Sequence, residues 1–158
     1  MSDAFLWIKT VHILSSTVLF GTGIGTAFHM WSAHATGDPR VIATVSRSVV
    51  WADLFFTTPA VIVQPISGAA LIWLSGIDPR APWLVVAYGL YGLAGACWLP
   101  VVGLQMKARD LAHAASIAGQ ALPPAYRRCM RVWFALGWPA FAAVLAIFWL
   151  MTTKPALW

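Results

Sequence analysis

The sequence predicts an all-α protein, a four-helix transmembrane bundle that forms one domain over residues 1–158. Apolar residues make up 60% of the chain and charged residues only 9%, whereas a soluble domain carries about 25% charged residues. The apolar residues gather in four segments, each long enough to cross a bilayer, which takes about 20 residues. Tryptophans, 10 in all, mark many segment ends, where amphipathic rings lie among lipid headgroups.

The four spans follow one another along the chain with unequal connections. The first is expected to be a retained helix, because its apolar stretch exceeds the roughly 7–15 residues of a signal-peptide core and no basic segment precedes it. The connection "SGIDPRA" is a tight turn. The longest connection begins as a continuation of the third helix, breaks at Gly119 and is stopped by Pro123 and Pro124. The predicted spans cover residues 4–30, 49–74, 82–106 and 130–152.

Lysine and arginine predict the orientation. The positive-inside rule places the more basic connections in the cytoplasm, so both termini are expected on the outer, periplasmic side of a bacterial cytoplasmic (inner) membrane. Nucleic acid is excluded as a partner, because the charges lie between apolar segments rather than on one polar face. The first and third connections hold Arg40, Arg47, Lys107, Arg109, Arg127, Arg128 and Arg131, and the opposite side holds Lys9, Arg80 and Lys154.

The stretch "FGTGIGTAFH" lies in the first span. It does not match a dinucleotide fingerprint, which needs a preceding strand and a different glycine spacing. Gly21 and Gly25 form a small-residue pair that allows close helix approach in lipid, and we expect them to face one neighbour together with His29. Gly23 falls on another face with His12, where a bare backbone leaves room either for the next helix or for a flat cofactor.

His12 is an ionisable residue inside the first span, and such residues are candidates for function. Three interpretations stay open: a metal ligand, a proton carrier, or a polar residue bonded to a neighbouring helix. Ser16 shares its helix face. His29 is a second candidate ligand near the inner end of the same helix. It lies about 25 Å from His12 along the axis, at 1.5 Å per residue, so the two cannot bind one metal ion.

The second span carries a polar stripe at helical spacing, formed by Asp53, Thr57, Gln64 and Ser67. The stripe is expected to face protein rather than lipid, as a hydrogen-bonded seam between helices or as one wall of a cofactor, quinone or ion site. Asp53 is expected near the cytoplasmic interface, close in depth to Arg47 and His29, and is interpreted as a salt-bridge residue or as a proton entry point. Two prolines in this span free backbone carbonyl groups that neighbouring groups or a cavity must satisfy.

A further set of residues on the predicted cytoplasmic side combines sulfur and imidazole groups, the ligands that suit copper(I). Their spacing matches no tight motif, so a chance grouping and a copper site both remain open. The set comprises His29, Met30, His34, Met106, His113, Cys129 and Met130.

Four stretches carry a family resemblance: "LWIKTVHILSSTVLFGTGIGTAFHMW", "FFTTPAVIVQPISG", "GACWLPVVGLQMKARDLA" and "FALGWPAFAAVLAIFWLM". They resemble a bacterial family of predicted integral membrane proteins, domain of unknown function 2269, which implies four membrane helices. More distantly, "LWIKTVHI" resembles the first helix of HemJ-type protoporphyrinogen IX oxidases and of CopD-type copper resistance proteins. The HemJ type is a haem-b enzyme with an early histidine that His12 matches, and His29 or His34 loosely echoes its second histidine.

Three functions follow from these features. The first is a haem-b membrane redox protein in which His12 binds the iron and Ser16, Gly23, Gln64 and Ser67 surround the ring. The second is a copper-handling membrane protein. The third is a non-enzymatic subunit or scaffold of a homo-oligomer or larger membrane complex. No Ser-His-Asp arrangement is present, so hydrolase chemistry has no support.

Overall fold

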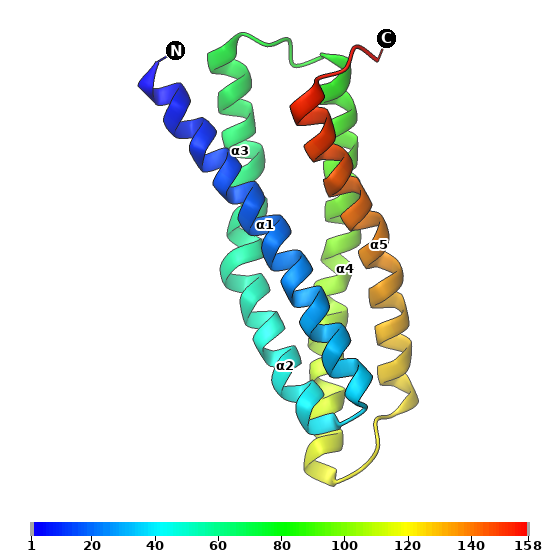
Figure 1. The fold of residues 1–158 in the computed structure, drawn as a ribbon. Coiled ribbons are helices and arrows are strands. Elements are labelled where there is room, and N and C mark those ends of the chain that lie inside the picture. The colour runs from blue at the N-terminus through cyan, green and yellow to red at the C-terminus, as the bar shows by residue number, and fades with distance from the viewer. Residues whose placement is uncertain (1, 158) are drawn as a thin grey trace.

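The computed structural model describes residues 2–157, which form an elongated bundle of helices running from one end of the molecule to the other (Figure 1). Within this range, four helical stretches are long and apolar enough to span a membrane, which confirms the predicted all-α four-helix fold. In chain order the elements are α1 (Asp3–Thr36), α2 (Pro39–Ala52), the π-helical turn η1 (Asp53–Thr57), α3 (Thr58–Ser75), α4 (Pro82–Ala118) and α5 (Pro124–Thr153).

The helices begin and end at residues suited to those positions. α1 stops at Gly37, whose φ of 66° is a left-handed conformation that glycine adopts without strain. Asp38 then caps α2, because its carboxylate accepts a hydrogen bond from the backbone N–H of Arg40 at 2.8 Å. α4 ends at Gly119, as predicted, with a φ of 63°, and α5 begins directly after Pro123.

The predicted spans all lie inside these helices, but the helices are longer. α1 continues to Thr36 and α4 to Ala118, both at the end of the bundle that carries the basic connections. At 1.5 Å per residue, the 34 residues of α1 measure about 51 Å, against about 30 Å for a hydrocarbon core. The bundle is therefore longer than the apolar layer it would cross.

The prolines of the second span are accommodated in two ways. Pro59 is the second residue of α3, and just before it the backbone N–H of Thr58 bonds to the carbonyl of Asp53, five residues earlier. Pro65 stays inside α3 and removes the donor that the carbonyl of Val61 would otherwise receive. The hydroxyl of Tyr91 on α4 donates to that carbonyl at 2.6 Å. A neighbouring helix thus satisfies the carbonyl, as expected of proline within a span.

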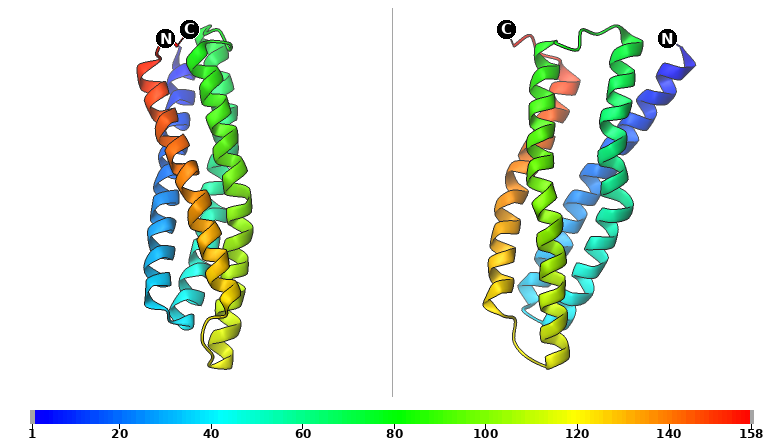
Figure 2. Two further views of the ribbon diagram at one scale, coloured as in Figure 1. Left: turned by 90° about the vertical axis from the view of Figure 1, so that its right-hand side faces the viewer. Right: turned by 180° about the vertical axis from the view of Figure 1, so that it is seen from behind.

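The helices pack as two groups. α1 contacts α2 and α3, α4 pairs with α5, and α2 joins the groups by packing against α4. Figures 1 and 2 show α1 crossing α2 and α3 obliquely, with both chain ends at the same end of the bundle. The α1–α2 and α4–α5 connections lie at the opposite end.

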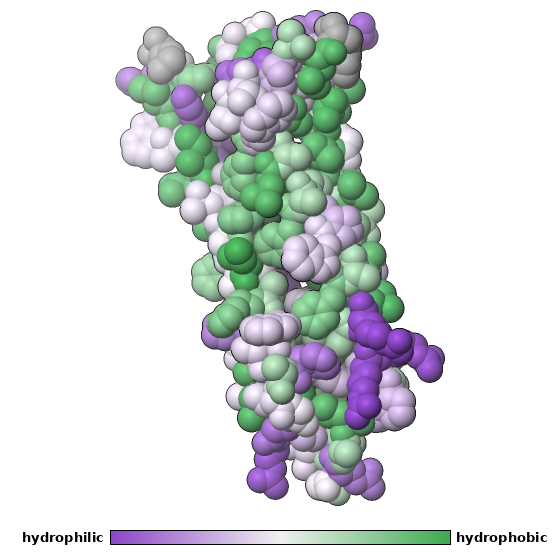
Figure 3. Space-filling model, turned by 45° about the vertical axis from the view of Figure 1, so that its right-hand side comes forward, coloured by the Kyte–Doolittle hydropathy of each residue, from purple (hydrophilic) through white to green (hydrophobic). Residues whose placement is uncertain are grey.

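The best-packed part of the molecule lies toward the α1–α2 and α4–α5 connections. Its cluster of buried residues includes Met30, Ile42, Ala112, Tyr126 and Met130. Elsewhere the exterior is apolar: Figure 3 shows hydrophobic side chains over the middle and the end with the termini, and hydrophilic ones mainly toward the opposite end. In the apolar window of α1, only 6% of the residues are buried inside the chain, so the rest of the bundle covers little of this helix completely.

The small-residue pair of α1 does not pack as predicted. A Cβ atom added to Gly21 or Gly25 would meet no atom of a neighbouring element within 4 Å, and His29 is exposed on the same helix. The prediction that these residues face a neighbouring helix is wrong for the single chain, because α1 turns a different side toward α3. That side carries Ser15, which is buried.

Candidate functional site

The clearest polar site joins α1 to α3 through His12. The Nδ1 atom of His12 lies 2.8 Å from the Oγ atom of Ser67. Ser67 has a single hydroxyl hydrogen, and it donates to the carbonyl of Val63 at 2.7 Å. With the Ser67 hydrogen directed to Val63, the Ser67 oxygen accepts from His12, and Nδ1 is the protonated nitrogen in that arrangement.

This hydrogen bond determines what the other ring nitrogen can do. In a neutral imidazole with a protonated Nδ1, the Nε2 atom has a free lone pair. Among residues 2–157, the side-chain hydrogen bond of the His12 ring is made at Nδ1, with Ser67. A histidine held by one nitrogen with the other free is the arrangement of a metal-ligating imidazole.

A second hydrogen bond lies beside the first. The Ser15 hydroxyl donates to the Oε1 atom of Gln64 and also lies 3.1 Å from the His12 carbonyl. Ser15 was not among the predicted site residues. It lies three positions after His12 and Ser16 lies four, so both are near its face of the helix. Ser15 is the one that faces α3, and this could be known only from the position of α3 beside α1.

Gly68 completes the site by leaving space. A Cβ atom at this position would lie 3.3 Å from Cε1 of the His12 ring, closer than nearly all real Cβ contacts. The imidazole therefore packs against bare backbone of α3. Sequence reasoning missed Gly68, although its position directly after Ser67 in the polar stripe was an available indication.

Two predicted cofactor residues lie elsewhere. The Ser16 hydroxyl donates to the Ile13 carbonyl of its own helix at 2.8 Å. Gly23 faces α5: an added Cβ would lie 3.6 Å from the ring of Phe141. The structure therefore brings His12, Gln64 and Ser67 together and separates them from Ser16 and Gly23. The ring of Phe141 on α5 lies beside Gly23.

The other part of the polar stripe forms a separate cluster around Asp53. One carboxylate oxygen accepts from the Thr57 hydroxyl at 2.8 Å, and the other accepts from the Nε2 atom of Gln105 on α4 at 2.8 Å. All three residues are buried. The Oε1 atom of Gln105 is also buried and has no hydrogen-bond partner among the described residues. Gln105 was not predicted as a partner.

The prediction that Asp53 forms a salt bridge is wrong. Across the described part of the chain, the one ion pair joins Arg109 to Asp110 at 2.8 Å, and Arg47 is exposed. The reason is geometric, since Asp53 faces α4 and its carboxylate is held by neutral donors.

The polar stripe faces inward, as predicted, but its residues belong to two separate clusters, one around His12 and one around Asp53. Asp53 and Gln64 are separated by about 16 Å of helix at 1.5 Å per residue.

The soft-ligand set is spread over the basic end of the bundle. Met30, Cys129 and Met130 are buried in the apolar cluster, and the Met30 sulfur accepts from Ser46 at 3.4 Å. His34 bonds to the Tyr126 hydroxyl at 3.2 Å. The remaining members, His29, Met106 and His113, are exposed. No group of three or more His, Cys, Asp or Glu side chains suited to a metal ion occurs within residues 2–157.

Four long apolar helices, a lipid-facing exterior and buried polar clusters define an integral membrane protein. Residues 6–155 match the family model described as Predicted integral membrane protein (DUF2269), and the chain belongs to this family. No curated protein and no solved structure matches the chain.

Proposed function

We propose that this protein is a haem-b-binding redox protein of the bacterial cytoplasmic membrane, in which His12 would hold the iron. The observation that carries the proposal is the hydrogen bond from His12 to Ser67, which leaves the Nε2 lone pair free. A protein binds haem iron through such a nitrogen and tunes it by the hydrogen bond on the opposite side of the ring.

The residues around His12 fit an axial ligand in part. Ser67 fixes the orientation of the imidazole, and Gly68 gives it room. Gln64 adds a polar side chain beside it, whereas Ser16 and Gly23 lie apart. When bound, haem supplies one-electron chemistry through the ferric and ferrous states of its iron. The described chain offers one histidine at this depth, so a second protein ligand would have to come from His12 of another copy of the chain.

The absorption spectrum of the purified protein tests this proposal. We expect a Soret band and haem b in a pyridine assay, both lost in His12→Ala. His29→Ala is the matched control, because it removes an exposed histidine of the same helix, and it should keep the spectrum. Protein that is folded, was produced with ample haem and shows no Soret band would refute the proposal.

Gly68→Ala tests the same site without removing the ligand. Its Cβ would push the His12 ring away from Ser67, so we expect a shifted Soret band and weaker haem retention. Gly89→Ala on α4 is the control, because a Cβ there meets no atom of a neighbouring element within 4 Å. An unchanged spectrum in Gly68→Ala would mean that the packing of the ring does not matter for binding.

A scaffold or complex subunit is the second candidate, and the Asp53 cluster favours it. The carboxylate oxygens of Asp53 pair with Thr57 and Gln105 inside the chain, as expected of a seam that only holds helices together. Normal folding and normal activity of a partner complex with His12→Phe would support this candidate over haem. Copper handling has less support, because Met30, Cys129 and Met130 are buried in the apolar cluster whereas His29, Met106 and His113 are exposed. Equal copper tolerance with and without the gene would count against it.

A further inference from the structure

A groove with a basic edge lies where α5 begins, beside the end of α1. Its volume is about 520 Å³. The residues that line it combine two arginines, a histidine and a tyrosine with apolar side chains. The main ones are His34, Tyr126, Arg127, Met130, Arg131 and Phe134.

The positive charge of this groove is not neutralised by the protein. Arg127 and Arg131 lie one helical turn apart on α5, and no acidic residue lines the groove. Neither arginine forms an ion pair with an acidic residue of the described chain. The carboxylate of Asp38, near the same end, is already bonded to the backbone N–H of Arg40. Two unpaired guanidinium groups at this spacing suit a phosphate group.

The apolar wall of the groove distinguishes a lipid from a free anion. Met130 is buried and Phe134 is partly buried against the core, and both lie on the first turns of α5 toward the apolar part of the helix. Tyr126 is fully buried and its hydroxyl is bonded to His34, which makes this wall rigid. A phosphate at the arginines would therefore lie beside an apolar surface at the end of a membrane span.

We propose that this groove binds an anionic phospholipid. The headgroup phosphate would lie against Arg127 and Arg131, and an acyl chain would follow the partly exposed Phe134 toward the membrane. Basic pockets between helix ends on the cytoplasmic side are suited to such headgroups. The second groove at this end is less suitable, because its Arg109 is paired with Asp110.

Titration of the detergent-purified full chain tests this proposal. The probes are short-chain phosphatidylglycerol, phosphatidylcholine with the same acyl chains, and inorganic phosphate, and the readouts are native mass spectrometry and the unfolding temperature. We expect phosphatidylglycerol to bind and to raise the unfolding temperature, with little effect from the other two. An equal effect of phosphatidylcholine would overturn the proposal, and an equal effect of inorganic phosphate would show a simple anion site instead of a lipid site.

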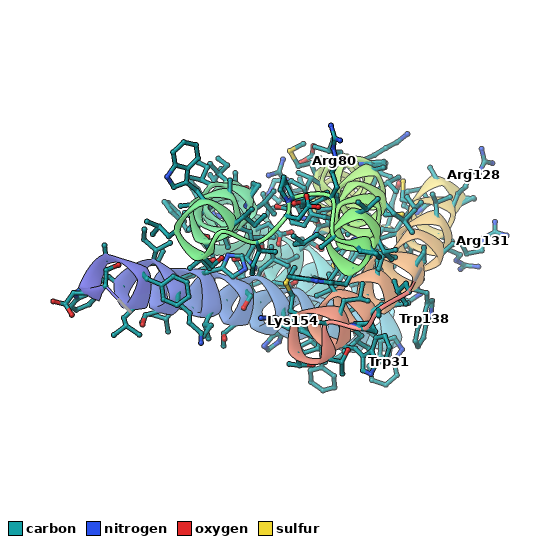
Figure 4. The ribbon with its side chains drawn as sticks, turned by 90° about the horizontal axis from the view of Figure 1, so that it is seen from above. Trp31, Arg80, Arg128, Arg131, Trp138 and Lys154 are labelled. Atoms are coloured by element: carbon teal, nitrogen blue, oxygen red, sulfur yellow. The ribbon has the colours of Figure 1, made fainter. Side chains whose placement is uncertain are left out.

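Paired double variants locate the binding. Arg127→Gln with Arg131→Gln should weaken phosphatidylglycerol binding about 25-fold, at roughly fivefold for each interfacial arginine. Arg80→Gln with Arg128→Gln removes the same charge and should leave the affinity unchanged. Figure 4 shows Arg128 and Arg131 projecting from α5 while Arg80 projects from a different part of the molecule. Equal losses in both double variants would refute the assignment to this groove.

The arginines are exposed, so the substitutions should not disturb folding, and circular dichroism checks this. If the Arg127→Gln with Arg131→Gln protein failed to fold, the comparison of phosphatidylglycerol with phosphatidylcholine on the unaltered chain would still decide the proposal.

Discussion

At the scale of single residues, hydrogen-bond partners distinguish Asp53 from His12. Both carboxylate oxygens of Asp53 receive a donor, from Thr57 and from Gln105, whereas the ring of His12 is engaged through one nitrogen. Leaving a buried polar group without a partner costs about 1–3 kcal/mol. Asp53 is therefore expected to stabilise the bundle. His12 has a second ring nitrogen with which it could bind a ligand.

Asp53→Ala should lower the free energy of unfolding by about 1–3 kcal/mol, because the donors of Thr57 and Gln105 would lose their acceptor. Asp53→Asn should cost less. Its amide keeps one acceptor oxygen and places a donor beside Gln105, whose Oε1 atom lacks a partner. Thermal unfolding in one detergent compares the variants. Equal losses for alanine and asparagine would show that these hydrogen bonds do not hold the helices together.

The sequence predicted which residues of the second span face inward, but not what they would meet. Asp53, Thr57 and Ser67 are buried as the helical spacing required. Which residues become their partners, here Ser15 and Gln105, is determined by how the other helices are rotated and shifted along the bundle axis. The spacing of polar residues within one helix gives no information about either. The salt bridge predicted for Asp53 failed for the same reason.

At the scale of elements, a side-chain hydrogen bond from α4 replaces a backbone hydrogen bond that α3 lacks. Pro65 removes the helical hydrogen bond to the Val61 carbonyl, and Tyr91 supplies a replacement across the helix interface. The sequence predicted the freed carbonyl, and the structure identifies the group that satisfies it. The end of α4 at Gly119 was also predicted, whereas α1 continues past its predicted span to Thr36.

A double-mutant cycle tests this coupling. Tyr91→Phe should destabilise the protein by about 1–3 kcal/mol, because the Val61 carbonyl would be left without a donor. In a Pro65→Ala background the loss should be smaller, since the new backbone N–H at position 65 would serve the same carbonyl. Thermal unfolding of the four proteins measures the difference. A Tyr91→Phe loss that is the same in both backgrounds would contradict the role assigned to Tyr91.

At the scale of the whole molecule, the bundle has two zones with different packing. Toward the α1–α2 and α4–α5 connections, side chains from all four long helical stretches form a buried apolar cluster. In the rest of the bundle, large apolar residues such as Trp73 and Trp138 point outward, at 86% and 77% exposure. Lipid would cover that zone, where helix contacts depend on shape and on polar pairs rather than on burial from water.

The orientation predicted from the basic connections can be tested by labelling. Asp78→Cys lies in the α3–α4 turn and Gln120→Cys in the α4–α5 connection, and both positions are exposed. In intact cells, a membrane-impermeant maleimide should label Asp78→Cys, whereas Gln120→Cys should react only after permeabilisation. The native Cys97 and Cys129 are buried and serve as the unlabelled background. The reverse pattern would place both termini in the cytoplasm.

The close approach of His12 to Gly68 has an evolutionary consequence. The two positions share one small volume, since a single added carbon at 68 would lie 3.3 Å from the imidazole. The two residues are 56 positions apart in the sequence, so separate mutations change them. Because they are in contact, we expect selection to keep only compatible pairs of residues at the two positions. Descendants that keep a histidine at 12 should keep glycine at 68. Lineages that exchange the histidine for a smaller residue should be the ones in which alanine or serine becomes acceptable at 68.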